Sequence, residues 1–265
     1  MYAFEYVRPG SLDEAVKLLG EQEEAKLIAG GQSFLPTLKL RLAQPETVVD
    51  LGALAGELKG IRRDGDNIVI GAMTTHAEVA ASAEVTSAIP GLAYLASLIG
   101  DPQVRHRGTL GGSIANADPG ADYPAAVVGL NATVHTTRRT IAADDFFTGM
   151  FETALEDDEI IRAVSFPIAE KSGYAKFRNP ASRYALVSVM VARTGGGVRV
   201  AVSGAGPSVF RVPEMEQALS SNFSPEAVAG IKVSPNDLNS DLYGTPEYRA
   251  HLVTVMARRA IVAAG

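Results

Sequence analysis

Cysteine is absent from the 265 residues of this sequence. Disulfide bonds, thiolate-ligated iron–sulfur clusters, zinc–thiolate sites and cysteine nucleophiles are therefore excluded, because each needs that side chain. The four histidines show no metal-ligand spacing such as H-x-x-x-H, and no Ser-His-acid set can be assembled from local motifs. We predict no metal site and no catalytic residue on this chain. Any metal redox centre would have to lie on another chain.

Long basic runs and long apolar runs are also missing. The formal net charge is −6, and the longest basic runs are the pairs Arg62-Arg63, Arg138-Arg139 and Arg258-Arg259. This pattern argues against nucleic acid as a partner. No window reaches the roughly 18 apolar residues of a membrane-spanning helix, and the first residues lack the basic segment of a secretory signal. We expect a cytoplasmic protein that is, at most, peripheral to the inner face of the membrane.

Apolar residues make up 46% of the sequence, enough for a globular core. The first half alternates strand-like and helix-like segments, as an α/β layer does. Capping-box patterns mark the start of two of the helices. The predicted elements are, in order, a helix from Ser11, a strand at 26–29, a helix from Phe34 whose apolar spacing continues to Leu42, strands at 47–51 and 67–72, a helix from Thr75 and a helix at 91–99.

The segment from Asp101 to Pro124 is different, because it is so rich in Gly, Pro, Asp and Asn that we predict no regular element there. Long irregular loops in compact domains are usually functional. Pro167 to Ser172 is the predicted domain boundary, after which three strands form a meander. The elements predicted after the loop are strands at 132–136, 160–166, 174–178, 185–193 and 198–203, and helices near 224–230 and 246–264.

Two glycine pairs stand out, in Ala29-Gly30-Gly31-Gln32-Ser33 and in Thr109-Leu110-Gly111-Gly112-Ser113. Glycine tolerates positive φ and lets a ligand approach the backbone, so successive amides can form an anion nest, to which the hydroxyls add donors. The first pair also lies between a strand and a helix, where the helix N-terminus favours phosphate. Each pair alone could be only a tight turn. Two pairs with flanking hydroxyls favour a pyrophosphate site.

The common nucleotide-binding motifs do not occur in this sequence. There is neither G-x-G-x-x-G after a strand nor G-x-x-x-x-G-K-[ST]. Gly204-Ala205-Gly206 lacks the third glycine and precedes Pro207, so we interpret it as a turn. A nucleotide held by glycine loops of another kind indicates the second large class of flavin-binding folds.

Longer stretches make a family resemblance specific. The segments at 27–41, 70–76 and 101–119, which include LIAGGQSFLPTLKLR, IGAMTTH and TLGGSIANADP, are similar to the medium subunits of molybdenum hydroxylases, which bind FAD. Residues 174–176 and 244–249 extend the similarity over nearly the whole chain. The sequence most resembles the carbon monoxide dehydrogenase type within this xanthine dehydrogenase family.

The resemblance implies an α+β fold. Residues 1–169 would form a two-part FAD-binding domain of the PCMH, or vanillyl-alcohol oxidase-like, type, with α/β parts at roughly 1–54 and 55–169. Residues 170–265 would form a small C-terminal α+β domain with a three-stranded sheet and helices, as in the carbon monoxide dehydrogenase flavoproteins.

The resemblance also assigns cofactor-binding roles to individual residues. Asp122 would contact cofactor hydroxyls, and Ile99 and Ile161 would pack on the flavin. The pyrophosphate would be wrapped by residues of the two glycine segments, namely Ala29, Gly30, Gly31, Gln32, Ser33, Thr109, Gly111, Gly112 and Ser113.

Two further residues would approach the flavin ring. Lys176 matches a lysine near the isoalloxazine, where a cation would stabilise the negative charge of the reduced ring. Without the resemblance, Lys176 would be read as a solvated strand lysine. Tyr184 would cover one face of the flavin, with ordinary packing as the alternative. Arg183 departs from the family, which often has an acidic residue there, and His76 is most simply explained by its position at a helix start.

The implied function is electron transfer within a complex. A small subunit would carry two iron–sulfur clusters, a large subunit would carry the molybdenum cofactor, and electrons would leave from FAD to a quinone, NAD or oxygen. The assembly would be a dimer of heterotrimers, and carbon monoxide is the first substrate to test. Two alternatives remain open from the sequence: a stand-alone flavin oxidoreductase with its own substrate, and a scaffold protein that has lost its flavin.

Overall fold

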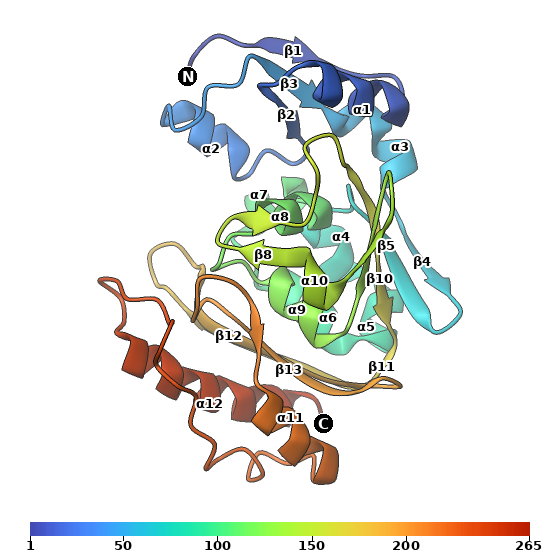
Figure 1. Ribbon diagram of the computed structural model, residues 1–265. Helices are drawn as coiled ribbons and strands as arrows, with labels where there is room; N and C mark the ends of the chain where they lie inside the picture. Colours follow the sequence, from blue (N-terminus) through green and yellow to red (C-terminus); the bar gives the residue numbers. More distant parts are fainter.

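Three tiers, which follow the order of the chain, make up the molecule (Figure 1). The computed structural model describes residues 1–265. An N-terminal tier with a small sheet lies at one end, a middle tier with a larger sheet and most of the short helices follows, and a C-terminal tier with a third sheet and two helices lies at the other end. No helix combines the length and apolar character that crossing a bilayer would require.

The N-terminal tier is a parallel sheet of order β1-β3-β2, formed by β1 (Glu5–Val7), β2 (Ala25–Ile28) and β3 (Thr47–Asp50). Helix α1 (Leu12–Glu21) begins where the Ser11 hydroxyl accepts a hydrogen bond from the Glu14 amide at 3.2 Å, as its sequence predicts. Its apolar face is buried with Val49 and Leu51 in one small core.

Helix α2 (Phe34–Lys39) is shorter than the apolar spacing suggests. Its last turn closes at Leu40, Arg41 adopts a positive φ of 60°, and Leu42 is 75% exposed instead of continuing a buried face. The connection from β3 to the middle tier consists of a 3₁₀ turn at Leu51–Leu54 and α3 (Ala55–Leu58).

The middle tier is built on an antiparallel sheet of order β4-β5-β10-β6-β7. Helix α4 begins with a complete capping box, in which the Thr75 and Glu78 side chains each bond the other residue's backbone, as predicted. The strands of this tier are β4 (Ile61–Asp64), β5 (Asn67–Gly71), β6 (Thr133–Thr136), β7 (Thr140–Ala142) and β10 (Ile161–Pro167), with the small pair β8 (Phe147–Gly149) and β9 (Glu152–Thr153). The helices are α4 (His76–Ala81), α5 (Ala83–Ala88), α6 (Pro90–Ser97), α7 (Pro102–Arg107), α8 (Leu110–Asn116), α9 (Tyr123–Gly129) and α10 (Ala143–Phe146).

The prediction that residues 101–124 contain no regular element is wrong, because α7, α8 and the start of α9 lie there. Pro102 occupies the first turn of α7, where its missing N–H costs nothing, and Asp101 caps that helix. Thr109 caps α8, which contains the second glycine pair in its first turn. Prolines and glycines usually indicate loops. In this segment they lie instead at the starts of helices and at close contacts between elements.

The C-terminal tier contains the predicted meander of β11 (Ala169–Arg178), β12 (Ala185–Thr194) and β13 (Gly197–Ser203), with the two-residue strand β14 (Phe210–Arg211) added at its edge. One face of β12 packs under α12 (Pro246–Ala263), while Met190 and Ala192 on its other face belong to the core of the middle tier. A side chain at Gly173 would overlap the Ala260 carbonyl, which explains how closely α12 approaches β11.

Helix prediction is less successful in this tier. The predicted helix near 224–230 is wrong, since these residues form turns. The missed helix is α11 (Pro213–Ser221), which begins with a proline in its first turn. The start of β11 at Ala169 also means that most of the predicted boundary segment is strand.

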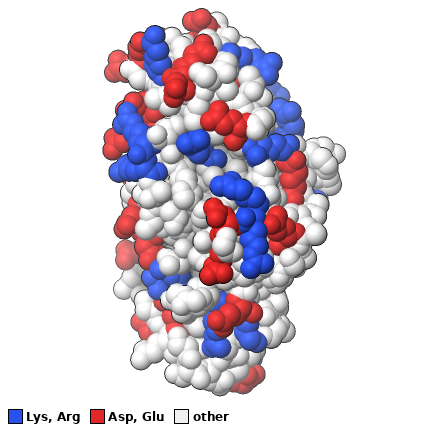
Figure 2. All heavy atoms as spheres, turned by 90° about the vertical axis from the view of Figure 1, so that its right-hand side faces the viewer, with Lys and Arg blue, Asp and Glu red and all other residues white.

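Charge on the face of the molecule turned toward the viewer in Figure 2 is mixed, with Lys and Arg interspersed among Asp and Glu.

Candidate cofactor site

A cavity of about 850 Å³ is lined by residues of all three tiers. The residues predicted from the sequence to bind a cofactor come from segments far apart in the chain, and the structure brings all of them to this one cavity. They are Ala29, Gly30, Gly31, Gln32, Ser33, Ile99, Thr109, Gly111, Gly112, Ser113, Asp122, Ile161, Lys176 and Tyr184. Their convergence supports a shared ligand, while the contact that each makes with it stays a prediction.

The first glycine segment is open at its backbone. The amides of Gly30, Gly31, Gln32 and Ser33 donate to no acceptor within the chain. Gly31 has a φ of +72°, a conformation that glycine adopts without the strain of a Cβ. Four successive free donors at the wall of a cavity are the arrangement that binds a phosphate or pyrophosphate.

The second glycine segment has a different structure, since its amides from Leu110 to Ser113 already donate hydrogen bonds within the chain. The Gly111 amide donates to the Ala72 carbonyl at 2.8 Å, and the Gly112 amide donates to the Thr109 hydroxyl at 3.1 Å. A side chain at Gly111 would lie 2.6 Å from the Ala72 Cβ. The missing side chain of Gly111 allows α8 to pack closely against the middle sheet, and Thr109 and Ser113 both line the cavity.

The two segments touch each other. A Cβ on Gly30 would overlap the Arg107 carbonyl and lie 2.8 Å from the Gly108 Cα. The close approach at Gly30 therefore joins the N-terminal tier to the middle tier at the cavity wall. The sequence predicted both pairs but not this contact, because no local pattern records a packing distance between residues more than 70 positions apart.

A buried ion pair forms another part of the wall. The Lys176 ammonium lies 2.8 Å from the Asp122 carboxylate, and the two side chains are 1% and 5% exposed. The hydroxyl of Tyr174 donates to the second oxygen of the same carboxylate. The alternative of a solvated strand lysine is therefore wrong for Lys176.

Tyr184 and Arg183 lie on the turn between β11 and β12. Arg183 adopts a φ of +63°, lines the cavity and donates to the Gly100 carbonyl at 3.4 Å. Tyr184 is 45% exposed, so it is not a core residue, and its ring leans against Gly120. A half-exposed aromatic ring at a cavity can cover a planar ligand.

His76, which the sequence explained by its position at a helix start, also belongs to the cavity wall. It occupies the first turn of α4, as its capping pattern indicates. Its Nδ1 atom is buried without a hydrogen-bond partner, and its ring packs 5.4 Å from that of Tyr123, centroid to centroid. Burial, with a smaller effect from the charge of Arg105, lowers the pKa of His76 to about 4. The imidazole is thus neutral near pH 7.

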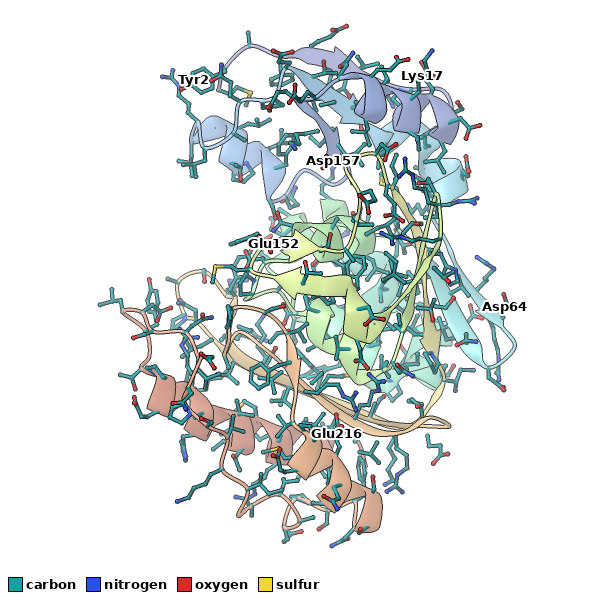
Figure 3. All side chains as sticks on the ribbon, viewed as in Figure 1. Tyr2, Lys17, Asp64, Glu152, Asp157 and Glu216 are labelled. Atoms are coloured by element: carbon teal, nitrogen blue, oxygen red, sulfur yellow. The ribbon has the colours of Figure 1, made fainter.

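Acidic residues that line the cavity were missed by the sequence analysis. Glu152, Glu156 and Asp157 line it, together with Lys26 from β2. Figure 3 shows Glu152 and Asp157 on the segment that runs between the N-terminal tier and the rest of the middle tier. A short acidic run is usually a solvated surface, so no signal in the sequence distinguishes it from an exposed loop.

The wall residues fit a flavin dinucleotide. The free amides of residues 30–33 match a pyrophosphate, Ile99 and Ile161 supply apolar surface for a ring system, and Asp122 offers acceptor oxygens for hydroxyl groups. The cavity is large enough for a dinucleotide, beyond the 300 Å³ of a small ligand site.

Comparison with known proteins gives the same assignment. The family described as the FAD binding domain in molybdopterin dehydrogenase matches residues 2–169. The medium subunit of nicotine 6-hydroxylase from Paenarthrobacter nicotinovorans is 40% identical over 99% of this chain and 98% of its own.

Two solved structures extend the similarity to the fold. Carbon monoxide dehydrogenase from Hydrogenophaga pseudoflava has a chain that matches with a TM-score of 0.89 and 38% identity, over 99% of this chain and 97% of that one. Quinoline 2-oxidoreductase from Pseudomonas putida 86 matches with a TM-score of 0.88 and 30% identity, over 99% and 97%. The resemblance predicted from the sequence, the fold class and the cofactor are confirmed: the chain belongs to the FAD-binding medium subunits of the molybdenum hydroxylases.

Proposed function

We propose that this chain is the electron relay of a larger complex, holding FAD between an iron–sulfur partner and an external acceptor. The observation that carries the proposal is a cavity with a backbone loop of four free amides and a buried polar wall, on a chain that contains no cysteine for clusters of its own. When bound, FAD supplies a redox centre that accepts electrons singly and releases them in pairs.

The residues of the chain divide the work of holding that cofactor. The amides of residues 30–33 bind the pyrophosphate, Ile99 and Ile161 exclude water from the ring, and Asp122 accepts hydrogen bonds from cofactor hydroxyls. Tyr184 would cover one face of the ring. The remaining site residues shape the wall: Gly30 through the contact with Arg107 and Gly108, Ala29 beside Gly112, and Thr109, Gly111, Gly112 and Ser113 through the packing of α8.

The partners follow from the family. A medium subunit belongs to a complex with large and small subunits, and we propose a small iron–sulfur subunit, a large molybdopterin subunit and a dimer of such heterotrimers. The acceptor would be a quinone, NAD or oxygen, taken up in the cytoplasm or at the inner face of the membrane. Within the chain, we assign residues 1–169 to the FAD-binding domain, with parts at roughly 1–54 and 55–169, and residues 170–265 to the C-terminal domain.

The substrate is selected by a partner subunit rather than by this chain. Relatives named for nicotine, carbon monoxide and quinoline resemble it over nearly its full length, at 40%, 38% and 30% identity. One type of medium subunit thus serves different substrates. Carbon monoxide and nicotine are the first two to test with the assembled complex.

The purified chain tests the relay directly. Loaded with FAD, it should be reduced by dithionite but stay oxidised with carbon monoxide, nicotine or an aldehyde, as followed by the flavin absorption. Adding the iron–sulfur and molybdenum subunits should bring reduction by substrate. Reduction of the chain alone by one of these substrates would instead show a stand-alone enzyme, and a chain that binds no FAD would refute the proposal.

A further inference from the structure

We propose that Asp122, Lys176 and Tyr174 form a charge-balanced triad that sets the reduction potential of the flavin, with Tyr174 as a positioning residue. In this triad Asp122 limits how much of the Lys176 charge reaches the cofactor. The inference rests on the proposed function in one respect, that the flavin ring lies against this wall.

The triad is assembled by two neighbouring elements. Tyr174 and Lys176 are two positions apart on β11, so their side chains leave the strand on the same face. Asp122 stands immediately before α9 and reaches both of them. Its Oδ2 atom lies 2.8 Å from the Lys176 Nζ, and its Oδ1 atom accepts the Tyr174 hydroxyl hydrogen.

Burial strengthens the electrostatic effect of the Lys176–Asp122 ion pair on its surroundings. The lysine and aspartate side chains are almost completely removed from solvent, and Tyr174 is fully buried beside them. Charges in such surroundings are weakly screened, and removing one partner leaves the other uncompensated. Burial and the nearby Asp122 charge raise the pKa of Tyr174 far above its usual value, so its hydroxyl keeps its hydrogen and continues to donate.

Both charged members line the cavity, whereas Tyr174 lies behind them. A flavin against this wall therefore meets an ion pair with no net charge, rather than a free lysine. The reduced ring carries more negative charge than the oxidised ring, so its stability follows the net charge of the wall. Removing the lysine should favour the oxidised form, and removing the carboxylate charge should favour the reduced form.

The test is a redox titration of the FAD-loaded full chain, followed by flavin absorption. We expect Lys176→Met to lower the midpoint potential and Asp122→Asn to raise it, each by the equivalent of about a tenfold change in the ratio of affinities for reduced over oxidised FAD. The double variant should return close to the original potential, because no unpaired charge remains.

Tyr174→Phe tests the positioning role. It removes one donor from the Asp122 carboxylate, so the potential should fall by less than in Lys176→Met. Tyr123→Phe is the matched control, since Tyr123 is equally buried but its hydroxyl has no partner, and its loss should leave the potential unchanged. If Lys176→Met does not fold, Lys176→Gln also removes the lysine charge and should lower the midpoint potential. The comparison of Tyr174→Phe with Tyr123→Phe tests the triad independently of Lys176.

Two results would overturn the triad. One is a shift of both charge variants in the same direction, and the other is bound FAD whose potential none of the variants moves. FAD content separates this failure from failure of the proposed function, because a chain that binds no FAD under any condition contradicts the function itself, whereas full flavin content with unmoved potentials contradicts only the triad.

Discussion

The two glycine pairs at the cavity share a short pattern, Gly-Gly followed closely by serine, but they differ in structure. At Gly30-Gly31 the backbone leaves regular structure, φ is positive at Gly31, and four amides have no acceptor. At Gly111-Gly112 the backbone is helical, and both amides donate within the chain. The first pair leaves free donors at the cavity, while in the second the missing side chain of Gly111 lets a helix pack closely against a sheet.

The difference indicates that a glycine pair at a cavity can have two separable uses. Positive φ and free donors serve the ligand, and the missing Cβ serves the packing. Both pairs line the same cavity, so their positions alone do not distinguish these uses. Substitutions that add only a Cβ, and matched substitutions with and without a charge, do distinguish them.

The largest effect should come from Gly30→Ala. The new Cβ would overlap the Arg107 carbonyl and lie 2.7 Å from the Arg107 carbonyl carbon, and neither backbone segment can yield cheaply. We expect a loss of about 3 kcal/mol in the free energy of unfolding, together with loss of FAD. Denaturant unfolding and flavin content of the purified protein measure the two effects. A variant with unchanged stability would show that this contact between the tiers is loose.

The next effect separates charge from shape at Gly31. Asn and Asp have the same size and tolerate positive φ better than other side chains. Gly31→Asp places a negative charge at the free amides, so we expect FAD affinity to fall by at least about 100-fold, or about 2.7 kcal/mol. Gly31→Asn should bind FAD much more tightly than Gly31→Asp. Equal affinities of the two variants, measured by titration with FAD, would contradict a phosphate site at this loop.

The free energy of unfolding should depend on pH through the turn that precedes the second glycine segment. His76 donates its backbone amide to the Gly108 carbonyl, and a side chain at Gly108 would lie 2.5 Å from the His76 Nε2, so the buried imidazole supports the turn before Thr109. Its pKa in the folded chain is about 4, below the 6.5 of an unperturbed imidazole. The unfolded chain therefore binds more protons between these values.

The stability that depends on neutral His76 is complete above pH 6.5 and is lost as the pH falls toward 4. The loss at pH 4 should be about 3 kcal/mol. His76→Gln should unfold with a weaker dependence on pH across this range, as seen by comparing denaturant midpoints at pH 7 and pH 4. Parallel pH profiles of the two proteins would show that His76 does not carry this effect.

The sequence predicted the elements whose signals are local. The hydroxyl caps at Ser11 and Thr75 form as expected, and the β-branched runs around Val187 and Val200 became buried strands. Local signals failed where one residue type has two uses. Pro102 and Gly111 indicated a loop, but a proline in the first turn and a glycine at a tight contact are both compatible with helix.

Motifs predicted residues that line one cavity, but they did not predict how those residues interact. Lys176 and Asp122 are 54 positions apart, and nothing near either residue indicates that they pair or that Tyr174 joins them. The pairing depends on how tertiary packing places β11 beside the residue that precedes α9. Net charge at the wall is therefore a property that only the folded chain reveals.

The smallest effect should come from Gly112→Ala, and it decides whether the two pairs really differ. A Cβ on Gly112 would meet only the Thr109 hydroxyl at 2.9 Å and the Ala29 Cβ at 3.8 Å. Thr109 caps α8 through that hydroxyl, so its side chain must move slightly, while alanine gains helix propensity over glycine. These opposing changes should leave the free energy of unfolding within about 1 kcal/mol of the original, with FAD content intact. Loss of FAD with the fold retained would mean that a ligand approaches the backbone at Gly112 as closely as at Gly31, and the second pair would then be a binding loop as well.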